Sequence, residues 1–209
     1  GTYCLVEVTP DDYIDGKDRA GTIQGSTVGS AENPGDKISD VVLPSGRDGI
    51  DYDFGELKEG SIAGKVFSDF DGDCIEDVGQ DRPIEDVLIQ LLDQQGHIVR
   101  ETRTDVDGKY RFDGLKPGIY SVREVQPLGY LQGGQKIGSG GGDSSVQDLL
   151  RTIPIGSGDR LIDYDFCEIP PADLSGWVFV DNNGDCEIQP DERGIGGVQV
   201  DLMDSSGRI

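Results

Sequence analysis

Basic residues are scarce in this sequence. It contains 18 lysines and arginines against 41 aspartates and glutamates, which gives a formal net charge of −23. Nucleic-acid backbones and anionic membrane surfaces attract basic proteins, so this balance argues against both as partners. The excess of acid instead fits a solvated extracellular surface or a protein that binds cations.

Long apolar runs and histidine are also lacking. No apolar run approaches the roughly 18 residues that a membrane-spanning helix needs, so we expect no membrane insertion in this segment. The one histidine, His97, lies in the turn-like stretch "DQQGHI". Cys–His and Ser–His–Asp sites need a positioned histidine base. We therefore predict that His97 is a surface turn residue and that the protein is not an enzyme.

Cysteine is limited to four residues, Cys4, Cys74, Cys167 and Cys186, and none of them forms a C-x-x-C motif. An even number of scattered cysteines favours disulfides in an oxidising compartment over a zinc site. We therefore expect an extracellular location, either on a cell surface or secreted. No signal peptide is visible, but the opening "GTYCLVEV" is typical of the middle of a strand, so the true N-terminus is expected elsewhere.

The chain repeats itself. "GIDYDFGEL" (49–57) returns as "LIDYDFCEI" (161–169), and "SIAGKVFSDFDGDC" (61–74) returns at the same spacing as "DLSGWVFVDNNGDC" (173–186). "GTYCLVEVTPDDY" (1–13) matches "GIYSVREVQPLGY" (118–130) at a slightly longer spacing, because a glycine-rich loop absorbs the difference. These spacings predict the C-terminal half of one repeat at 1–59, a complete repeat at 60–170 and the N-terminal part of a third at 171–209.

The complete repeat has the pattern of an all-β domain. Short segments alternate apolar and polar residues, as strands with one buried face do, and are separated by turns. We predict apolar, inward-facing positions at Ile62, Val87, Ile89 and Leu91. Seven such strands in about 110 residues predict an antiparallel β-sandwich. The glycine-rich stretch "GGQKIGSGGGD" (133–143) is predicted to be a flexible connection.

Two acidic loops interrupt this pattern. Side-chain or main-chain oxygens recur at alternate positions, which is the ligand spacing of an EF-hand calcium loop. In the first loop the predicted ligands are Asp69, Asp71, Asp73, the carbonyl of Ile75, Asp77 and, as a further candidate, Asp81. In the second loop they are Asp181, Asn183, Asp185, the carbonyl of Glu187, Gln189 and Glu192.

Calcium would offset the repulsion between closely spaced carboxylates, which costs about 1 kcal/mol per close pair even in water. The alternative is a solvated acidic turn without an ion. Two features depart from an EF-hand: the sixth position holds Cys74 or Cys186 in place of glycine, and no amphipathic helix flanks either loop.

"SGWVFVDNNGDCEIQPDERGIGGVQVDLMD" (175–204), "TRTDVDGKYRFDGLKPGIYSVREVQPLGY" (102–130) and "IDYDFGE" (50–56) together resemble a known family. They look like the B-repeats of bacterial surface proteins of the serine-aspartate-repeat type, which are prealbumin-like (collagen-adhesin B-type) β-sandwiches. The resemblance implies calcium-stabilised modules arranged in tandem as a stalk. A related branch forms Lys–Asn isopeptide bonds. Lys65 and Glu124 match two of its positions, but "DYDFCE" has no asparagine, so Lys65 is expected to be an exposed strand lysine.

The expected function is therefore a non-catalytic, calcium-stabilised spacer or fibre segment whose partners are neighbouring repeats, including self-assembly into fibres. The alternative is a ligand-binding adhesin module for carbohydrate or a protein partner. It predicts recurring exposed aromatic residues, whereas Trp177 occurs once and is expected to pack in a core or between domains.

The cysteines carry the last prediction. Cys167 lies only a short stretch of sequence before Cys186, across the linker, and Cys4 could reach Cys74 in the same sense. We therefore predict the pairs Cys4–Cys74 and Cys167–Cys186, which would crosslink each domain to the next. Free or intermolecular thiols are the alternative.

Overall fold

The computed structural model describes residues 1–208 and is built of β-strands, with no helix in that part of the chain. The described residues therefore contain no helix long and apolar enough to cross a membrane. The chain divides into two compact units, one from Gly1 to Pro171 and one that starts at Ala172. The boundaries predicted from the repeats, at residues 59 and 170, stay a prediction.

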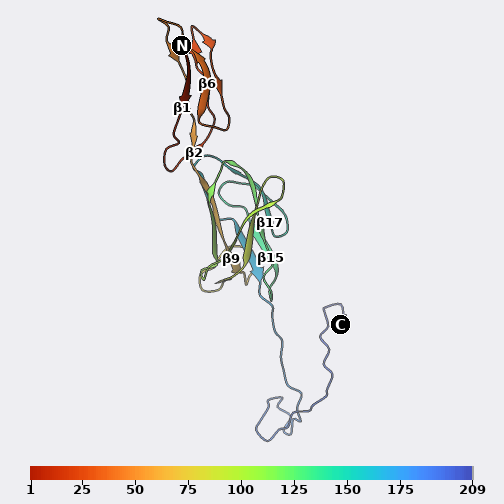
Figure 1. Cartoon of the computed structure of the whole chain (residues 1–209). Coiled ribbons are helices and arrows are strands. Elements are labelled where there is room, and N and C mark those ends of the chain that lie inside the picture. The colour runs from red at the N-terminus through yellow and green to blue at the C-terminus, as the bar shows by residue number, and fades with distance from the viewer. Residues whose placement is uncertain (209) are drawn as a thin grey trace. The chain divides into compact units, whose positions relative to one another are not determined.

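Residues 60–169 form a domain of two sheets, which we call the central domain (Figure 1). The first sheet holds β9 (Gly60–Ser68), β10 (Arg82–Pro83), β13 (Lys109–Leu115), β15 (Leu131–Lys136), β18 (Arg160–Leu161) and β19 (Asp165–Ile169). The second holds β11 (Leu88–Leu92), β12 (Ile98–Arg103), β14 (Gly118–Glu124), β16 (Asp143–Val146) and β17 (Leu149–Ile155). The all-β prediction is confirmed.

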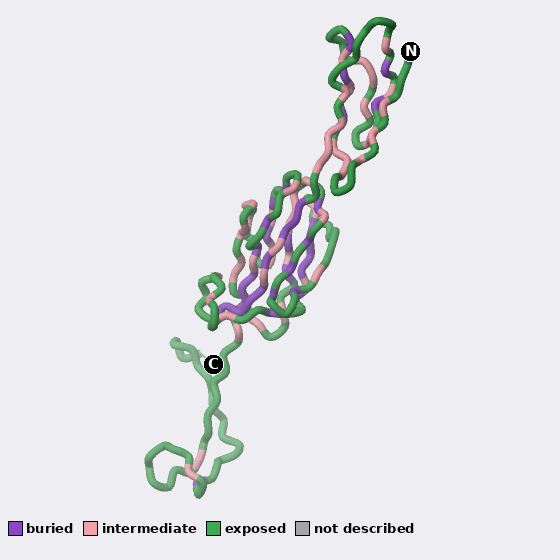
Figure 2. The backbone as a smooth tube through the Cα atoms, turned by 90° about the vertical axis from the view of Figure 1, so that its left-hand side faces the viewer, coloured by how far each residue is buried: buried purple, intermediate pink, exposed green. Residues whose placement is uncertain are grey.

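A single apolar core fills this domain. Ile62, Val87, Ile89 and Leu91, which the alternation assigns to the inside, are 0–3% exposed. Figure 2 shows the buried residues running along the strands of the central domain. The core also takes in aromatic side chains from two strands or their flanks: Tyr110 and Phe112 of β13, Phe166 of β19 and Tyr164 just before it. Alternation finds these positions because successive side chains of a strand point to opposite faces.

The first and last strands of the domain lie side by side. β9 pairs antiparallel with β13 and β10 but parallel with β18 and β19. The antiparallel prediction thus holds for the other strand pairs of the domain and has its exception here. The register Cys167↔Phe67 brings the end of β19 to the end of β9, where the first acidic loop begins. Asp69 continues this contact, because its N–H donates to the carbonyl of Glu168 at 2.7 Å.

The glycine-rich stretch is not a flexible connection over its first residues, so that prediction is wrong. Leu131–Lys136 forms β15, which pairs antiparallel with β19. Glycine is needed there because of what lies beneath: a Cβ on Gly134 would sit 3.3 Å from the Cys167 sulfur and 3.6 Å from that of Cys74. The glycines let a strand backbone pass close over a disulfide, a role that composition alone does not reveal.

Residues 1–57 contain the remaining strands: β1 (Thr2–Val6), β2 (Ile14–Asp15), β3 (Thr22–Ile23), β4 (Ser26–Thr27), β5 (Ser30–Ala31), β6 (Lys37–Val42), β7 (Gly49–Ile50) and β8 (Glu56–Leu57). The sheet order β1-β6-β5 matches β14-β17-β16 of the central domain. The registers also match: Leu5 pairs with Ile38 as Val122 pairs with Leu150, which are the equivalent positions of the sequence repeat. The repeat is therefore structural as well as sequential.

Residues 172–208 form no strand; the structure assigns one bridge there, Phe179↔Gly194. Trp177, expected in a core or between domains, is 76% exposed. The structure thus does not place Trp177 in a core, and that prediction is wrong for the described residues.

Candidate metal loops

The first loop starts where β9 ends, and its first carboxylate organises the backbone. Asp69 is 2% exposed. Its Oδ1 accepts a hydrogen bond from the N–H of Gly72 at 2.7 Å, and its Oδ2 accepts one from the N–H of Cys74 at 2.7 Å. Burial acts to raise the pKa of Asp69, but these amide hydrogen bonds outweigh it and lower the pKa. The loop therefore holds this carboxylate in its charged form.

The next two predicted ligands join the first. Asp69, Asp71 and Asp73 each offer an oxygen, and these oxygens lie within 4.8 Å of one another. Burial and then the charge of Asp73 raise the pKa of Asp71, as expected for carboxylates crowded without a counter-ion. Lys65 does not fill that role, because its Nζ pairs with Glu76 at 2.5 Å.

Asp81 closes the first loop by accepting two backbone hydrogen bonds. Its Oδ1 accepts from the N–H of Phe70 at 3.1 Å, and its Oδ2 accepts from the N–H of Asp77 at 2.7 Å. In the second loop, Glu192 accepts from the N–H groups of Asn182 (2.8 Å) and Gln189 (3.1 Å). In both loops the donors are positions 2 and 9. Asp81 therefore occupies the place of Glu192, with the extra residue of the first loop absorbed before it.

The second loop repeats the first in detail. Asp181 accepts from the N–H groups of Gly184 (2.6 Å) and Cys186 (2.9 Å), and these bonds lower its pKa. Asn183 Oδ1 accepts from the N–H of Asp185 at 3.0 Å. Gln189, the ninth position, donates through Nε2 to Asp185 at 2.7 Å, while its Oε1 is buried without a hydrogen-bond partner.

The residues that would offer main-chain ligands follow the same pattern. Asp73 Oδ1 accepts from the N–H of Ile75, and Asp185 Oδ1 accepts from the N–H of Glu187, both at 2.8 Å. Asp77 is held at its side chain by Gln80 Nε2 at 3.3 Å. The two loops therefore share their backbone hydrogen bonds, and the first loop brings the carboxylates of positions 1, 3 and 5 together.

The cysteine at the sixth position adopts the backbone that glycine has in an EF-hand loop. Cys74 has φ 57° and Cys186 has φ 60°, both left-handed. This conformation costs a non-glycine residue about 1–2 kcal/mol. Both loops carry this cost at the same position.

The predicted disulfide pairs are wrong. Cys74 is bonded to Cys167, with their Cα atoms 5.5 Å apart, and Cys4 and Cys186 are free and exposed. The reason is the parallel pairing of β9 with β19, which places Cys167 directly beneath the loop that β9 leads into. The prediction relied on proximity in sequence, whereas the bond joins residues 93 apart. The disulfide ties the loop to its own domain.

All candidate ligands are oxygens. Calcium takes six to eight hard oxygen ligands and tolerates irregular geometry, zinc favours histidine or thiolate, and magnesium keeps several waters. The one cysteine in the first loop is committed to a disulfide, which leaves no thiolate for zinc there. The donor set and the unpartnered Gln189 oxygen thus fit a calcium ion.

The profile of the SdrD B-like domain matches residues 60–165, just over half of the sequence. The chain belongs to the SdrD B-like domain family. Serine-aspartate repeat-containing protein E of Staphylococcus aureus strain Mu50 is 30% identical over the whole of this chain and 18% of its own length. Protein D of strain Newman is 29% identical over 82% of this chain and 13% of its own length. The chain thus spans less than a fifth of the length of these curated relatives.

Solved structures resemble this B-like chain only distantly. GBS52, the minor pilin of Streptococcus agalactiae, is 14% identical, with 70% of each chain covered and a TM-score of 0.38. The Bacillus anthracis TIE protein is 12% identical, with 81% of this chain and 34% of its own covered and a TM-score of 0.45. At these values the likeness carries no functional information.

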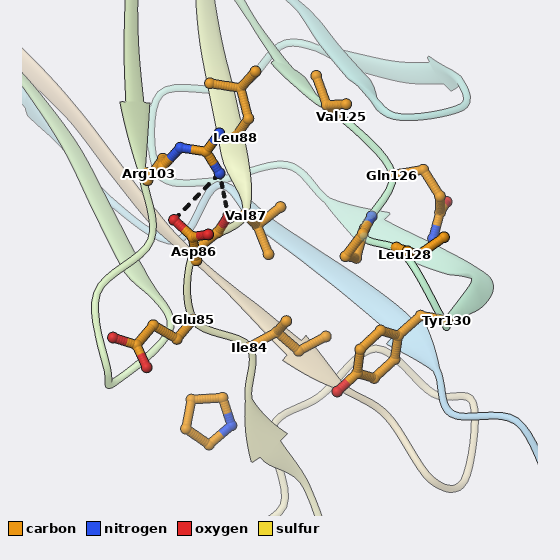
Figure 3. Close-up of a pocket in the computed structure, with 12 residues that line it drawn as sticks. Ile84, Glu85, Asp86, Val87, Leu88, Arg103, Val125, Gln126, Leu128 and Tyr130 are labelled. Atoms are coloured by element: carbon orange, nitrogen blue, oxygen red, sulfur yellow. Dashed lines mark hydrogen bonds and ion pairs between the residues drawn. The ribbon is translucent and has the colours of Figure 1, made fainter.

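A shallow groove of about 560 Å³ lies on the central domain of the B-like chain (Figure 3). Leu128 and Tyr130 line one side of the groove. On the opposite side, the Arg103 guanidinium donates to the carbonyl of Asp86 at 2.6 Å and pairs with the Asp86 carboxylate at 3.2 Å. Gln126 also lines the groove. Its side-chain amide donates to Glu168, a buried acid that the sequence analysis does not single out.

Proposed function

We propose that this chain is part of a non-catalytic spacer or fibre segment, stabilised by calcium, in an extracellular protein that is secreted or attached to a cell surface. Asp69, Asp71, Asp73, Ile75, Asp77 and Asp81 would hold one ion, and Asp181, Asn183, Asp185, Glu187, Gln189 and Glu192 a second. The partners would be neighbouring repeats. Membership of the SdrD B-like family supports a structural module, and the disulfide fits an oxidising compartment.

One observation carries the calcium part of this proposal. Two loops at equivalent places of successive repeats, with different residues at several positions, use the same backbone hydrogen bonds to their first carboxylate and to their closing carboxylate. A solvated acidic turn has no reason to keep this arrangement twice. A divalent ion would supply the positive charge that the crowded oxygens lack and would lock the first loop against β19.

Removal of calcium tests whether the loops bind this ion. Binding to the folded state adds RT ln(1 + [L]/Kd), about 2.7 kcal/mol at a hundredfold excess over Kd, so calcium should raise the melting temperature. Scanning calorimetry of the chain with EDTA and with calcium measures the difference. Asp73→Ala, which removes a ligand oxygen, should lose most of the shift, whereas the matched control Asp113→Ala, at an exposed position of β13, should keep it. An unchanged melting curve after complete chelation would contradict the proposal.

The second candidate is a ligand-binding adhesin module, and the groove in Figure 3 is the feature that favours it. Its rim exposes Leu128 fully and Val125 in part, which is typical of a contact surface more than of a spacer. Glycan-array or peptide-array binding that is lost on Leu128→Ser would favour this function over the spacer.

A further inference from the structure

Three carboxylates from separate parts of the chain meet inside the central domain, and none of them belongs to the acidic loops. Glu124 ends β14, Asp148 lies in the turn between β16 and β17, and Glu168 lies on β19. Each offers an oxygen, and these oxygens lie within 4.8 Å of one another. Glu124 is 2% exposed and Glu168 is completely buried. We call Glu124, Asp148 and Glu168 the acid cluster.

The buried oxygens of the acid cluster lack partners. Both carboxylate oxygens of Glu124 and Oε1 of Glu168 are buried with no hydrogen-bond partner. The donors to the other oxygens are neutral: Gln126 donates to Glu168 and Gln132 donates to Asp148. A buried carboxylate without a partner is strongly unfavourable, so these oxygens require either a proton or a cation.

The surroundings of the acid cluster provide no positive charge among the described residues. Burial, followed by the charges of Glu168 and Asp148, raises the pKa of Glu124. Burial also raises the pKa of Glu168, where the hydrogen bond from Gln126 and the neighbouring Glu124 carboxyl act in the opposite direction and the charge of Asp148 adds to the rise. No lysine or arginine is among the groups that shift either carboxyl.

The same three positions are acidic in residues 1–57. The sequence repeats align Glu7 with Glu124, Asp36 with Asp148 and Glu56 with Glu168. The Glu7 N–H donates to the Asp36 carbonyl at 3.0 Å, as the Glu124 N–H donates to the Asp148 carbonyl at 3.0 Å.

The oxygens of the counterpart also lack partners. Asp36 Oδ1 and Glu56 Oε2 are buried without hydrogen-bond partners. Burial, then the charges of Glu7 and Asp36, raises the pKa of Glu56. The cluster thus recurs in both repeats, with the same backbone hydrogen bond and again with buried carboxylate oxygens that have no hydrogen-bond partner.

We propose that Glu124, Asp148 and Glu168 bind a divalent cation of the calcium class, at a site separate from the acidic loops. The ligands are carboxylate oxygens, which suit a hard ion, and neither histidine nor thiolate is among them. Rotation of the Gln126 or Gln132 amide would present its oxygen in place of its nitrogen and add a neutral ligand. Asp148 is half-exposed and Gln126 lines the open groove of Figure 3, so an ion can enter from solvent.

The position of the site gives the ion a structural role. Glu124 belongs to the sheet β12-β11-β14-β17-β16, whereas Glu168 belongs to β19 of the other sheet. A cation held by both would join the two sheets through these strands. Cation binding by the acid cluster does not depend on calcium binding at the loops, so it can be measured with the loops disabled.

The test is a count of bound calcium in the full chain. In a background where Asp71→Ala, Asp73→Ala, Asp181→Ala and Asp185→Ala remove ligand oxygens from both loops, equilibrium dialysis against calcium measures the calcium that remains bound. We expect the added pair Glu124→Gln and Glu168→Gln to remove one bound calcium per chain. The pair Glu59→Gln and Glu85→Gln removes the same charge from exposed positions and should leave the count unchanged.

A second variant guards against misfolding of the first. Asp148 has φ 57°, a conformation that asparagine tolerates, and it lies in a half-exposed turn, so Asp148→Asn should fold. We expect it to weaken calcium binding at this site at least tenfold. A calcium count that stays the same in folded Glu124→Gln/Glu168→Gln, or an unchanged affinity in Asp148→Asn, overturns the proposal and leaves a shared proton as the partner of these carboxylates.

Discussion

At the scale of single residues, Gly64 shows how the first and last strands approach each other. A Cβ on Gly64 would collide with the backbone carbonyl of Tyr164, which also accepts a hydrogen bond from the Tyr110 hydroxyl at 2.6 Å. Backbone cannot move aside as a flexible side chain can. The glycine therefore permits the parallel contact on which the rest of the domain depends.

We expect Gly64→Ala to lower the free energy of unfolding by about 1–3 kcal/mol or more, the usual cost of overpacking a core. Urea denaturation of the chain measures it. Gly176 is the counterpart of Gly64 one repeat later, and a Cβ there meets nothing within 4 Å. Gly176→Ala is therefore the matched control and should be neutral; equal losses in the two variants would refute the steric explanation.

Asp143 offers a prediction on pH. Hydrogen bonds from the backbone and side chain of Ser145, and then from Arg151, lower the pKa of Asp143 from 3.8 to about 2. A depressed acid pKa stabilises the folded state above the unfolded pKa and loses that contribution as pH falls through the folded pKa. The Asp143→Asn variant should therefore be less stable than the parent above pH 4, by a small amount because the group is exposed.

Thermal melts of both proteins between pH 6 and about pH 2 check this prediction. The difference in melting temperature should shrink as pH falls below 3.8 and should vanish near pH 2. A difference that stays constant over this range would mean that asparagine acts through packing and that the Asp143 charge contributes nothing.

At the scale of elements, the disulfide couples the first loop to β19. Cys74 supplies an N–H to Asp69 at 2.7 Å and is bonded to Cys167, so the same residue connects the candidate metal ligands and the sheet. Gly134 of β15 covers this bond closely. The first loop, β19 and β15 are therefore held together by the disulfide and by strand pairing.

We expect Cys74→Ala with Cys167→Ala to lower the free energy of unfolding by about 2–5 kcal/mol, since the bond closes a long loop in the unfolded chain. Calcium affinity should fall as well, because the loop is no longer tied to β19 through Cys167. Calorimetry in calcium and in EDTA separates the two effects. Cys4→Ala removes an exposed free thiol and is the control. A double-alanine variant with unaltered calcium affinity would show that the disulfide does not position the loop.

At the scale of the whole molecule, the repeat predicts a chain of similar modules joined by short links. The link residues that follow β19, "PPADLS" (170–175), begin with Pro170–Pro171, and consecutive prolines favour a stiff extended conformation. Stiff links between modules are what a spacer needs.

We therefore expect small-angle scattering of the chain in calcium to give a radius of gyration well above the roughly 17 Å of a compact globule of 209 residues. Replacing Pro170 and Pro171 by glycine should broaden the distribution of distances without changing the melting of the central domain. A radius near that of a single globule would contradict the spacer role.

The sequence by itself determined the features that depend on local pattern. Alternation located Ile62, Ile89 and Leu91 in the core, because a strand buries every second side chain. The spacing of oxygens in "DFDGDC" and "DNNGDC" located both acidic loops, because neighbouring residues of a loop turn around a common centre. The doubled motifs revealed the repeat, and equivalent positions of the two copies pair in the same register.

Only the tertiary structure decided the features that depend on residues far apart in the chain. Parallel pairing of β9 with β19 brought Cys167 to Cys74 and overruled the shorter distance in sequence to Cys186. The same closure turned a glycine-rich stretch into β15 and gathered Glu124, Asp148 and Glu168 from two sheets. These contacts arise when the last strand docks beside the first, and no local pattern records which distant residues that docking will bring together.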